Sequence, residues 1–186
     1  MNLLEMKKKV LGLIEELDAN NELLTDDPDI STKINDVINQ VMFELARMKK
    51  IPGYIEIEAI KDQLITFDDI EKESGAMVYQ IDNIKGEYEL KAQGTVIKAT
   101  EDGVLEISYF KYPEQITEKT KDKAYEFELS QDMLEILPYG VAADILKSDV
   151  SADYGSVYSA RYETMVARLD PRYAMTSVYI EGGLEV

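Results

Sequence analysis

Hydrophobic residues recur at three- and four-residue steps in two segments of the first fifty residues. In the first segment they are Leu3, Met6, Val10, Leu13, Ile14 and Leu17, and in the second they are Ile34, Val37, Ile38, Val41, Met42 and Leu45. This spacing is typical of amphipathic α-helices. Asp29 is the candidate N-cap of the second helix, and Pro52 prevents its continuation. Residues 1–51 are therefore predicted to form an antiparallel helix pair, with Lys7, Lys8 and Lys9 as solvated lysines.

Over residues 52–129 the spacing changes to alternation of hydrophobic and polar positions. Alternation places one face of a strand in a core and the other in water, as in an antiparallel sheet. The turn signals at 93–94 and 101–103 separate three consecutive strands and predict a meander. About six strands are expected, at 54–59, 77–81, 88–92, 95–99, 105–109 and 125–129. Together they predict one small antiparallel β-domain.

From residue 130 onward the spacing is helical again. Residues 133–146 are almost continuously hydrophobic, which predicts a buried helix capped by Ser130 and kinked or split at Pro138. A last helix is expected from a cap at Ser151 to about Leu169. The predicted fold class is thus α+β: a small helical bundle from residues 1–51 and 130–170, an inserted antiparallel β-domain at 52–129, and an extended C-terminal arm at 171–186.

The composition lacks the residues from which most active sites are built. The chain has no His and no Cys, which excludes Ser-His-Asp triads, cysteine nucleophiles and nearly all catalytic zinc sites. Its 20 Lys and Arg against 37 Asp and Glu give a net charge of −17, which opposes stable binding of nucleic acid. No hydrophobic run approaches the roughly 20 residues of a membrane span. We expect no enzyme activity, no cofactor, no bound metal and no membrane partner.

Two acidic clusters offer alternative interpretations. Residues 26–29 lack the Gly and Glu that a calcium-binding EF-hand loop requires at its sixth and twelfth positions, so a capped helix start is the better interpretation. Asp68, Asp69, Glu71 and Glu73 could pair carboxylates for acid–base chemistry, but a solvated loop before Gly75 is favoured. A third alternative, an acidic mimic of DNA, fits poorly because the acids alternate with hydrophobic residues as on a sheet surface.

Tyrosine and arginine concentrate in the last quarter of the chain. Six of the 12 tyrosines and three of the four arginines follow residue 138. Both residue types are common interface hot spots, because they combine a large contact area with directed hydrogen bonds. The candidate residues for contact with other subunits or a partner are Tyr154, Tyr158, Arg161, Tyr162, Arg168, Arg172, Tyr173, Tyr179 and Ile180. The alternatives are that the tyrosine stripe packs on its own domain and that the arm folds back.

Three segments resemble the head-tail connector, or adaptor, proteins of tailed bacteriophages: 25–39, 137–149 with the sequence LPYGVAADILKSD, and 158–169. The resemblance implies a non-enzymatic virion protein, made in the host bacterial cytoplasm, that contacts the portal and a tail or neck protein at the head-tail junction. It also implies a homo-oligomeric ring of about twelve copies that extends the DNA channel. An acidic lining would let DNA slide through. Alternatives are another neck or tail-completion protein, or a non-phage domain that uses its carboxylates for binding or catalysis.

Overall fold

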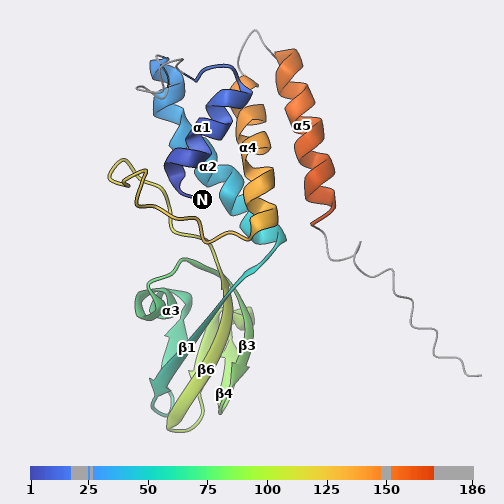
Figure 1. The fold of residues 1–186 in the computed structure, drawn as a ribbon. Helices are drawn as coiled ribbons and strands as arrows, with labels where there is room; N and C mark the ends of the chain where they lie inside the picture. Colours follow the sequence, from blue (N-terminus) through green and yellow to red (C-terminus); the bar gives the residue numbers. More distant parts are fainter. Residues whose placement is uncertain (18–24, 26, 148–151, 170–186) are drawn as a thin grey trace, which may run out of the picture.

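The computed structural model describes residues 1–17, 25, 27–147 and 152–169. Within them the protein is α+β, as predicted, with most helices gathered at one end and two small antiparallel sheets with one further helix at the other (Figure 1). None of the helices in these ranges is long and hydrophobic enough to cross a membrane. The arm at 171–186, with Arg172, Tyr173, Tyr179 and Ile180, and the predicted cap Ser151 lie outside the described residues.

Helices α1 (Leu3–Leu13) and α2 (Pro28–Met48) match the predicted pair. Asn2 caps α1 by accepting a 2.9 Å hydrogen bond from the Glu5 N–H, and the Glu5 side chain accepts one from the Asn2 N–H. The predicted N-cap of α2 was wrong: Asp27 caps the helix and accepts a 2.8 Å bond from the Asp29 N–H. The reason is Pro28, whose fixed φ and missing N–H suit the first helical position, so the helix begins before Asp29.

Helix α4 (Gln131–Leu146) lies at the centre of the bundle and contacts α1, α2 and α5 (Ala152–Ala167). It continues through Pro138, so the predicted split does not occur. An internal proline costs about 3 kcal/mol, but α4 buries ten residues, most of them hydrophobic, and burial of each large side chain returns about 1.5–3 kcal/mol. Ser130 precedes the helix without making a capping hydrogen bond, contrary to expectation.

The strands form two three-stranded sheets rather than one. One sheet has the order β1 (Ile51–Ala59), β6 (Gly103–Lys111), β3 (Val78–Lys85), and the other has the order β2 (Leu64–Thr66), β5 (Val96–Ala99), β4 (Tyr88–Lys91). The predicted meander is only half correct, because β4 pairs with β5 but β6 leaves for the other sheet. Side chains from both sheets fill one core, in which Ile65, Ile97 and Ile107 are almost fully buried.

Helix α3 (Phe67–Ser74) stands where a loop was expected, and the short helix η1 (Ala92–Gly94) joins β4 to β5.

Residues 112–130 belong with the helices and not with the sheets. The predicted strand at 125–129 is wrong: its one ladder contact is an isolated bridge between Asn2 and Glu126. Its alternation has another cause, since Tyr125, Phe127 and Leu129 are buried in the core of the helical bundle. The strands therefore end at β6, and the predicted boundary at residue 129 lies well beyond the last of them.

Two polar contacts fix this segment to the bundle. The buried Asn39 amide donates to the Ile116 carbonyl at 2.7 Å and accepts from the Ile116 N–H at 2.8 Å. Lys7 is 7% exposed and forms an ion pair with Asp122 at 2.9 Å, so its interpretation as a solvated lysine was wrong. The cause is the segment itself, which covers α1 and supplies the carboxylate.

Aromatic side chains join the two ends of the molecule. The ring of Tyr112 lies between those of Phe43 and Tyr79, with centroids 4.9 and 4.8 Å away. The Tyr79 hydroxyl on β3 donates to the Ala46 carbonyl on α2 at 3.0 Å. These contacts link strand β3 to helix α2 and set how the sheets meet the bundle.

Candidate functional site

Helix α5 carries most of the predicted contact residues, and it is attached to α4 at two glycines. A Cβ added to Gly140 would lie 2.8 Å from Cε2 of Tyr162 and 2.7 Å from Val41. A Cβ added to Gly155 would lie 3.2 Å from Cβ of Leu146. Without side chains at these positions the two helices approach closely, and this defines which face of α5 is turned inward.

Two of the predicted contact residues lie on that inward face. Tyr158 donates from its hydroxyl to the Leu13 carbonyl of α1 at 2.5 Å, and its ring lies 6.4 Å from that of Tyr139. Tyr162 packs against the bundle core, and its hydroxyl has no hydrogen-bond partner among the described residues. Burial, with the nearby Glu44 carboxylate, raises the pKa of Tyr162 above its ordinary value. These two tyrosines therefore fasten α5 to its own chain.

The other described candidates are exposed. Tyr154 belongs to the solvent-exposed surface that we call the outward face of α5, whereas Arg161 and Arg168 line hollows beside it. Tyr154 is 69% exposed and Val157, three residues on, is 63% exposed. Arg161 and Arg168 are exposed and form no ion pair within the described part of the chain. The Arg161 guanidinium instead lies over the Tyr139 ring, 4.3 Å from its centroid. The predicted stripe is thus divided between a packing face and a free face.

A groove runs along α5, bounded by α1 and α4 at one end and lined by residues 160–168 alone at the other. It consists of two adjoining hollows of about 360 and 440 Å³, which share Arg161 and Met165. We call it the α5 groove. Its charged lining residues are three cations, Lys9, Arg161 and Arg168, and one acid, Glu135. Its hydrophobic lining residues are Leu13, Pro138, Tyr139, Ala160 and Met165.

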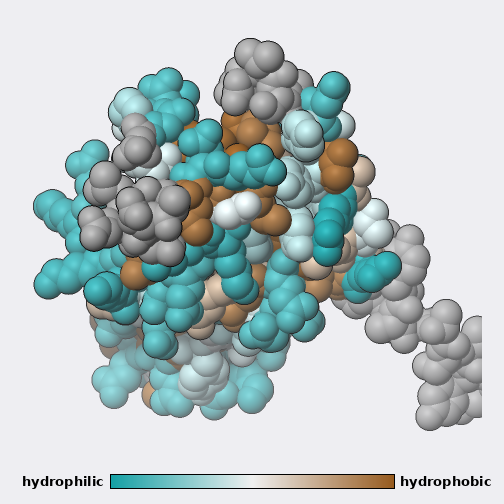
Figure 2. Space-filling view, turned by 45° about the horizontal axis from the view of Figure 1, so that its top comes forward, coloured by the Kyte–Doolittle hydropathy of each residue, from teal (hydrophilic) through white to brown (hydrophobic). Residues whose placement is uncertain are grey.

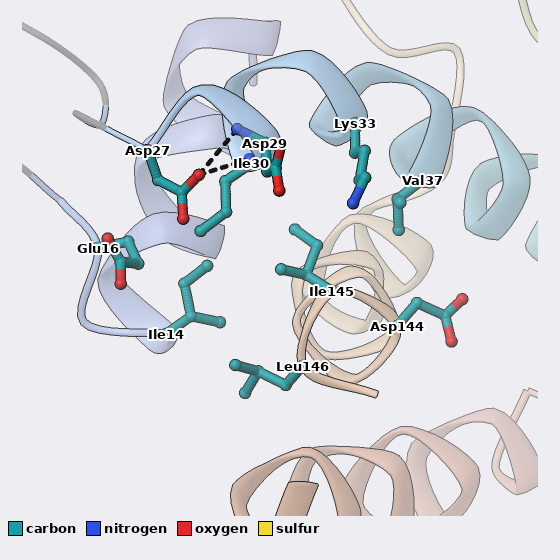
Figure 3. A pocket seen from close by; sticks show the side chains of 10 residues that line it. All are labelled: Ile14, Glu16, Asp27, Asp29, Ile30, Lys33, Val37, Asp144, Ile145 and Leu146. Atoms are coloured by element: carbon teal, nitrogen blue, oxygen red, sulfur yellow. Dashed lines mark hydrogen bonds between the residues drawn. The ribbon is translucent and has the colours of Figure 1, made fainter. Parts of the chain in front are cut away.

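A separate hollow, of about 300 Å³, opens at the end of the bundle farthest from the sheets (Figures 2 and 3). Figure 2 shows hydrophobic surface between the helices there, surrounded by hydrophilic residues. Its floor is aliphatic, with Ile14, Ile30 and Ile145 directed into it. Its charged lining residues are four acids and one cation: Glu16, Asp27, Asp29, Asp144 and Lys33. Two rim carboxylates already have partners, since Asp27 caps α2 and Asp144 is paired with Lys147.

The two acidic clusters considered in the sequence have structural roles where they are described. Asp69 accepts hydrogen bonds from the Thr66 N–H and hydroxyl at 2.9 and 2.7 Å. These bonds belong to the capping box of α3, in which Thr66 is the N-cap, and they lower the pKa of Asp69. Glu71 accepts a 2.7 Å bond from the Val78 N–H. A general acid needs a raised pKa, so the shift of Asp69 has the wrong direction for that role. Among the described residues no group of three or more acids could hold a metal ion.

The sequence was compared with models of known protein families and with curated proteins, and neither comparison finds a match. The surfaces described above therefore carry the functional argument. Sequence reasoning had not identified Val157, Tyr139 or Lys9 as parts of the free face and the groove. The sequence shows that Val157 is apolar, Tyr139 aromatic and Lys9 cationic, but it does not show the packing that places them on these surfaces.

Proposed function

We propose that this protein is a structural subunit of a tailed-bacteriophage virion, a head-tail connector that forms a ring between the portal and the tail and extends the DNA channel. The observation that supports it best is the division of α5 into two faces. One face is fastened to the chain through Tyr158 and Tyr162. The other presents Tyr154 and Val157, more than 60% exposed.

An exposed Tyr and Val on adjacent turns are well suited to contact another protein. Residues three apart on a helix lie side by side, so Tyr154 and Val157 form one hydrophobic patch. Clustered exposed hydrophobic side chains rimmed by polar residues are typical of interaction sites. Tyr and Arg are enriched among the residues that contribute most to binding. The outward face of α5 is therefore the proposed subunit or portal contact.

The net charge fits passage of DNA through a ring of such subunits. At −17 per chain, a ring repels phosphate groups and favours transient passage over binding. In this proposal the helical bundle forms the ring, and the strands between residues 51 and 111 are carried as an inserted domain. The resemblance of segments 25–39, 137–149 and 158–169 to the connector family gives the proposal its place at the head-tail junction.

The proposal predicts a portal gene close to this one, and the test is co-expression with that portal protein, followed by cryo-electron microscopy. The proposal expects a ring of about twelve copies bound coaxially to the portal. The double variant Tyr154→Ala/Val157→Ala should lose the ring while remaining folded. Leu64→Ala is the matched control, since Leu64 is a 59% exposed hydrophobic residue on β2, and this variant should assemble normally. A chain that stays monomeric with its portal, or that turns over a substrate, overturns the proposal.

A further inference from the structure

We propose that the α5 groove binds residues 173–186 of a second copy of this chain. This inference rests on the proposed ring, because it identifies one contact that would join neighbouring subunits. It concerns the groove beside α5, which is distinct from the exposed patch of Tyr154 and Val157.

The groove combines an apolar floor with excess positive charge in a strongly acidic protein. Three cations and one acid line it, whereas the whole chain carries almost twice as many acids as bases. The Arg161 guanidinium lies over the Tyr139 ring and forms no ion pair within the described residues, so its N–H donors can bind an incoming carboxylate. Pro138 and Met165 supply apolar contact area. Such a groove suits a segment that is hydrophobic, aromatic and acidic.

Residues 173–186 have that composition. The segment contains seven large hydrophobic or aromatic residues, namely Tyr173, Met175, Val178, Tyr179, Ile180, Leu184 and Val186. Its only charged residues are Glu181 and Glu185, which are opposite in sign to Arg161 and Arg168. Charge complementarity of this kind favours the correct partner and register.

The direction and length of the chain favour a second copy over the segment's own subunit. Residues 160–168, at the end of α5, line the groove, and only residues 169–172 separate them from the proposed segment. Return to the same groove would require an immediate reversal. The fourteen residues of the segment can span up to about 45 Å, and the part of α5 that lines the groove is about 12 Å long at 1.5 Å per residue. The segment is therefore long enough to cover the groove of a neighbouring subunit.

The two contact surfaces lie on different parts of the chain. A groove on one subunit that binds the arm of the next is a head-to-tail interface, and repeated head-to-tail contacts generate a ring when the rotation closes. The arm contact would therefore contribute directly to a ring of identical subunits.

Engineered cysteines test the contact, because the natural chain contains none. Thr164→Cys, in the groove, and Ser177→Cys, in the arm, are placed on separate full-length chains that differ in mass tag, mixed and oxidised. We expect disulfide-linked heterodimers at least tenfold above the background given by Ser156→Cys, an exposed α5 position outside the groove. Arg161→Glu with Arg168→Glu should lower the yield at least tenfold, and Glu181→Arg with Glu185→Arg on the other chain should restore it.

Each result decides the inference. A cross-link only within one chain, seen when both cysteines are placed together, overturns it in favour of the segment's own subunit. Rings that assemble without the cross-link overturn the groove contact and leave the proposed function standing. Cross-linked chains that form no ring with the portal uphold the groove contact and overturn the connector function. Absence of both the cross-link and the ring overturns both.

Discussion

The ring of Tyr162 lies directly on Gly140, so that a Cβ at residue 140 would come within 2.8 Å of Cε2 of the tyrosine. Val41 of α2 approaches the same point at 2.7 Å. Gly140 is therefore where α2, α4 and α5 meet, and the absence of its side chain lets α5 pack against the bundle. The orientation of the outward face of α5 depends on this contact.

Gly140→Ala should lower the free energy of unfolding. Overpacking costs about 1–3 kcal/mol, which outweighs the roughly 1 kcal/mol that Ala gains over Gly in a helix. Urea unfolding followed by circular dichroism measures the difference. Gly12→Ala is the control, because the Cβ at Gly12 in α1 meets nothing within 4 Å. That variant should be up to about 1 kcal/mol more stable, and equal effects of the two substitutions would contradict the packing described.

Substitution of the buried Asn39 should lower the free energy of unfolding strongly. Asn39→Ala removes both partners of the Ile116 backbone and leaves its N–H and carbonyl buried without hydrogen bonds. The expected loss is about 2–4 kcal/mol of unfolding free energy. Gln40→Ala, exposed on the same helix, should change stability by less than about 0.5 kcal/mol. If Asn39→Ala were equally mild, Asn39 would not anchor residues 112–130.

The cap of α3 should make stability depend on pH in one direction. The Thr66 N–H, and then its hydroxyl, lower the pKa of Asp69 below its ordinary value of 3.8. A carboxyl whose pKa is lower in the folded state stabilises the protein above its unfolded pKa, and this contribution disappears as the pH falls through the folded pKa. Asp69→Asn should therefore be less stable than the parent at neutral pH.

The difference between the parent and Asp69→Asn should shrink as the pH is lowered below 3.8, the ordinary pKa of the carboxyl. Urea midpoints measured from pH 7 to below this value check it. Glu73→Gln, exposed on the same helix, is the matched control and should run parallel to the parent. A gap between Asp69→Asn and the parent that is the same at every pH would show that the charge of Asp69 is not what caps the helix.

Most helices and strands could be predicted because their hydrophobic spacing is long and regular. Helix α3 was missed although its signals are present, namely Thr66 and Asp69 three residues apart and Gly75 in the left-handed conformation that ends it. The segment 125–129 shows the reverse error. Its alternation reflects side chains directed into the helical core, and alternation alone does not distinguish this from pairing in a sheet. The partners of each strand depend on contacts between distant residues, which local spacing does not contain.

The division of α5 into two faces could not be predicted from the sequence either. Tyr154, Tyr158 and Tyr162 are spaced by four, which suggests one stripe. Each step of four turns the side chain by about 40° in a helix of 3.6 residues per turn, so Tyr154 and Tyr162 lie about 80° apart around the axis. Gly140 of α4 and Gly155 of α5 then determine which end of the stripe is covered, and only the packed structure shows that Tyr162 is on the inside.

The same division gives opposite predictions for two tyrosines of one helix. Tyr158→Phe removes the hydroxyl that donates to the Leu13 carbonyl, so it should lower the unfolding free energy by about 0.5–1.5 kcal/mol and leave assembly unchanged. Tyr154→Ala removes a 69% exposed ring, so it should leave stability within about 0.5 kcal/mol and weaken assembly. If Tyr154 is a hot spot, the assembly constant falls by more than about tenfold, equivalent to 1.4 kcal/mol or more.

Sedimentation velocity with and without the portal measures assembly, and urea unfolding measures stability. If Tyr158→Phe weakened assembly and Tyr154→Ala did not, the contact face of α5 would be the one now packed against the bundle, and the assignment of the outward face as the interface would be wrong.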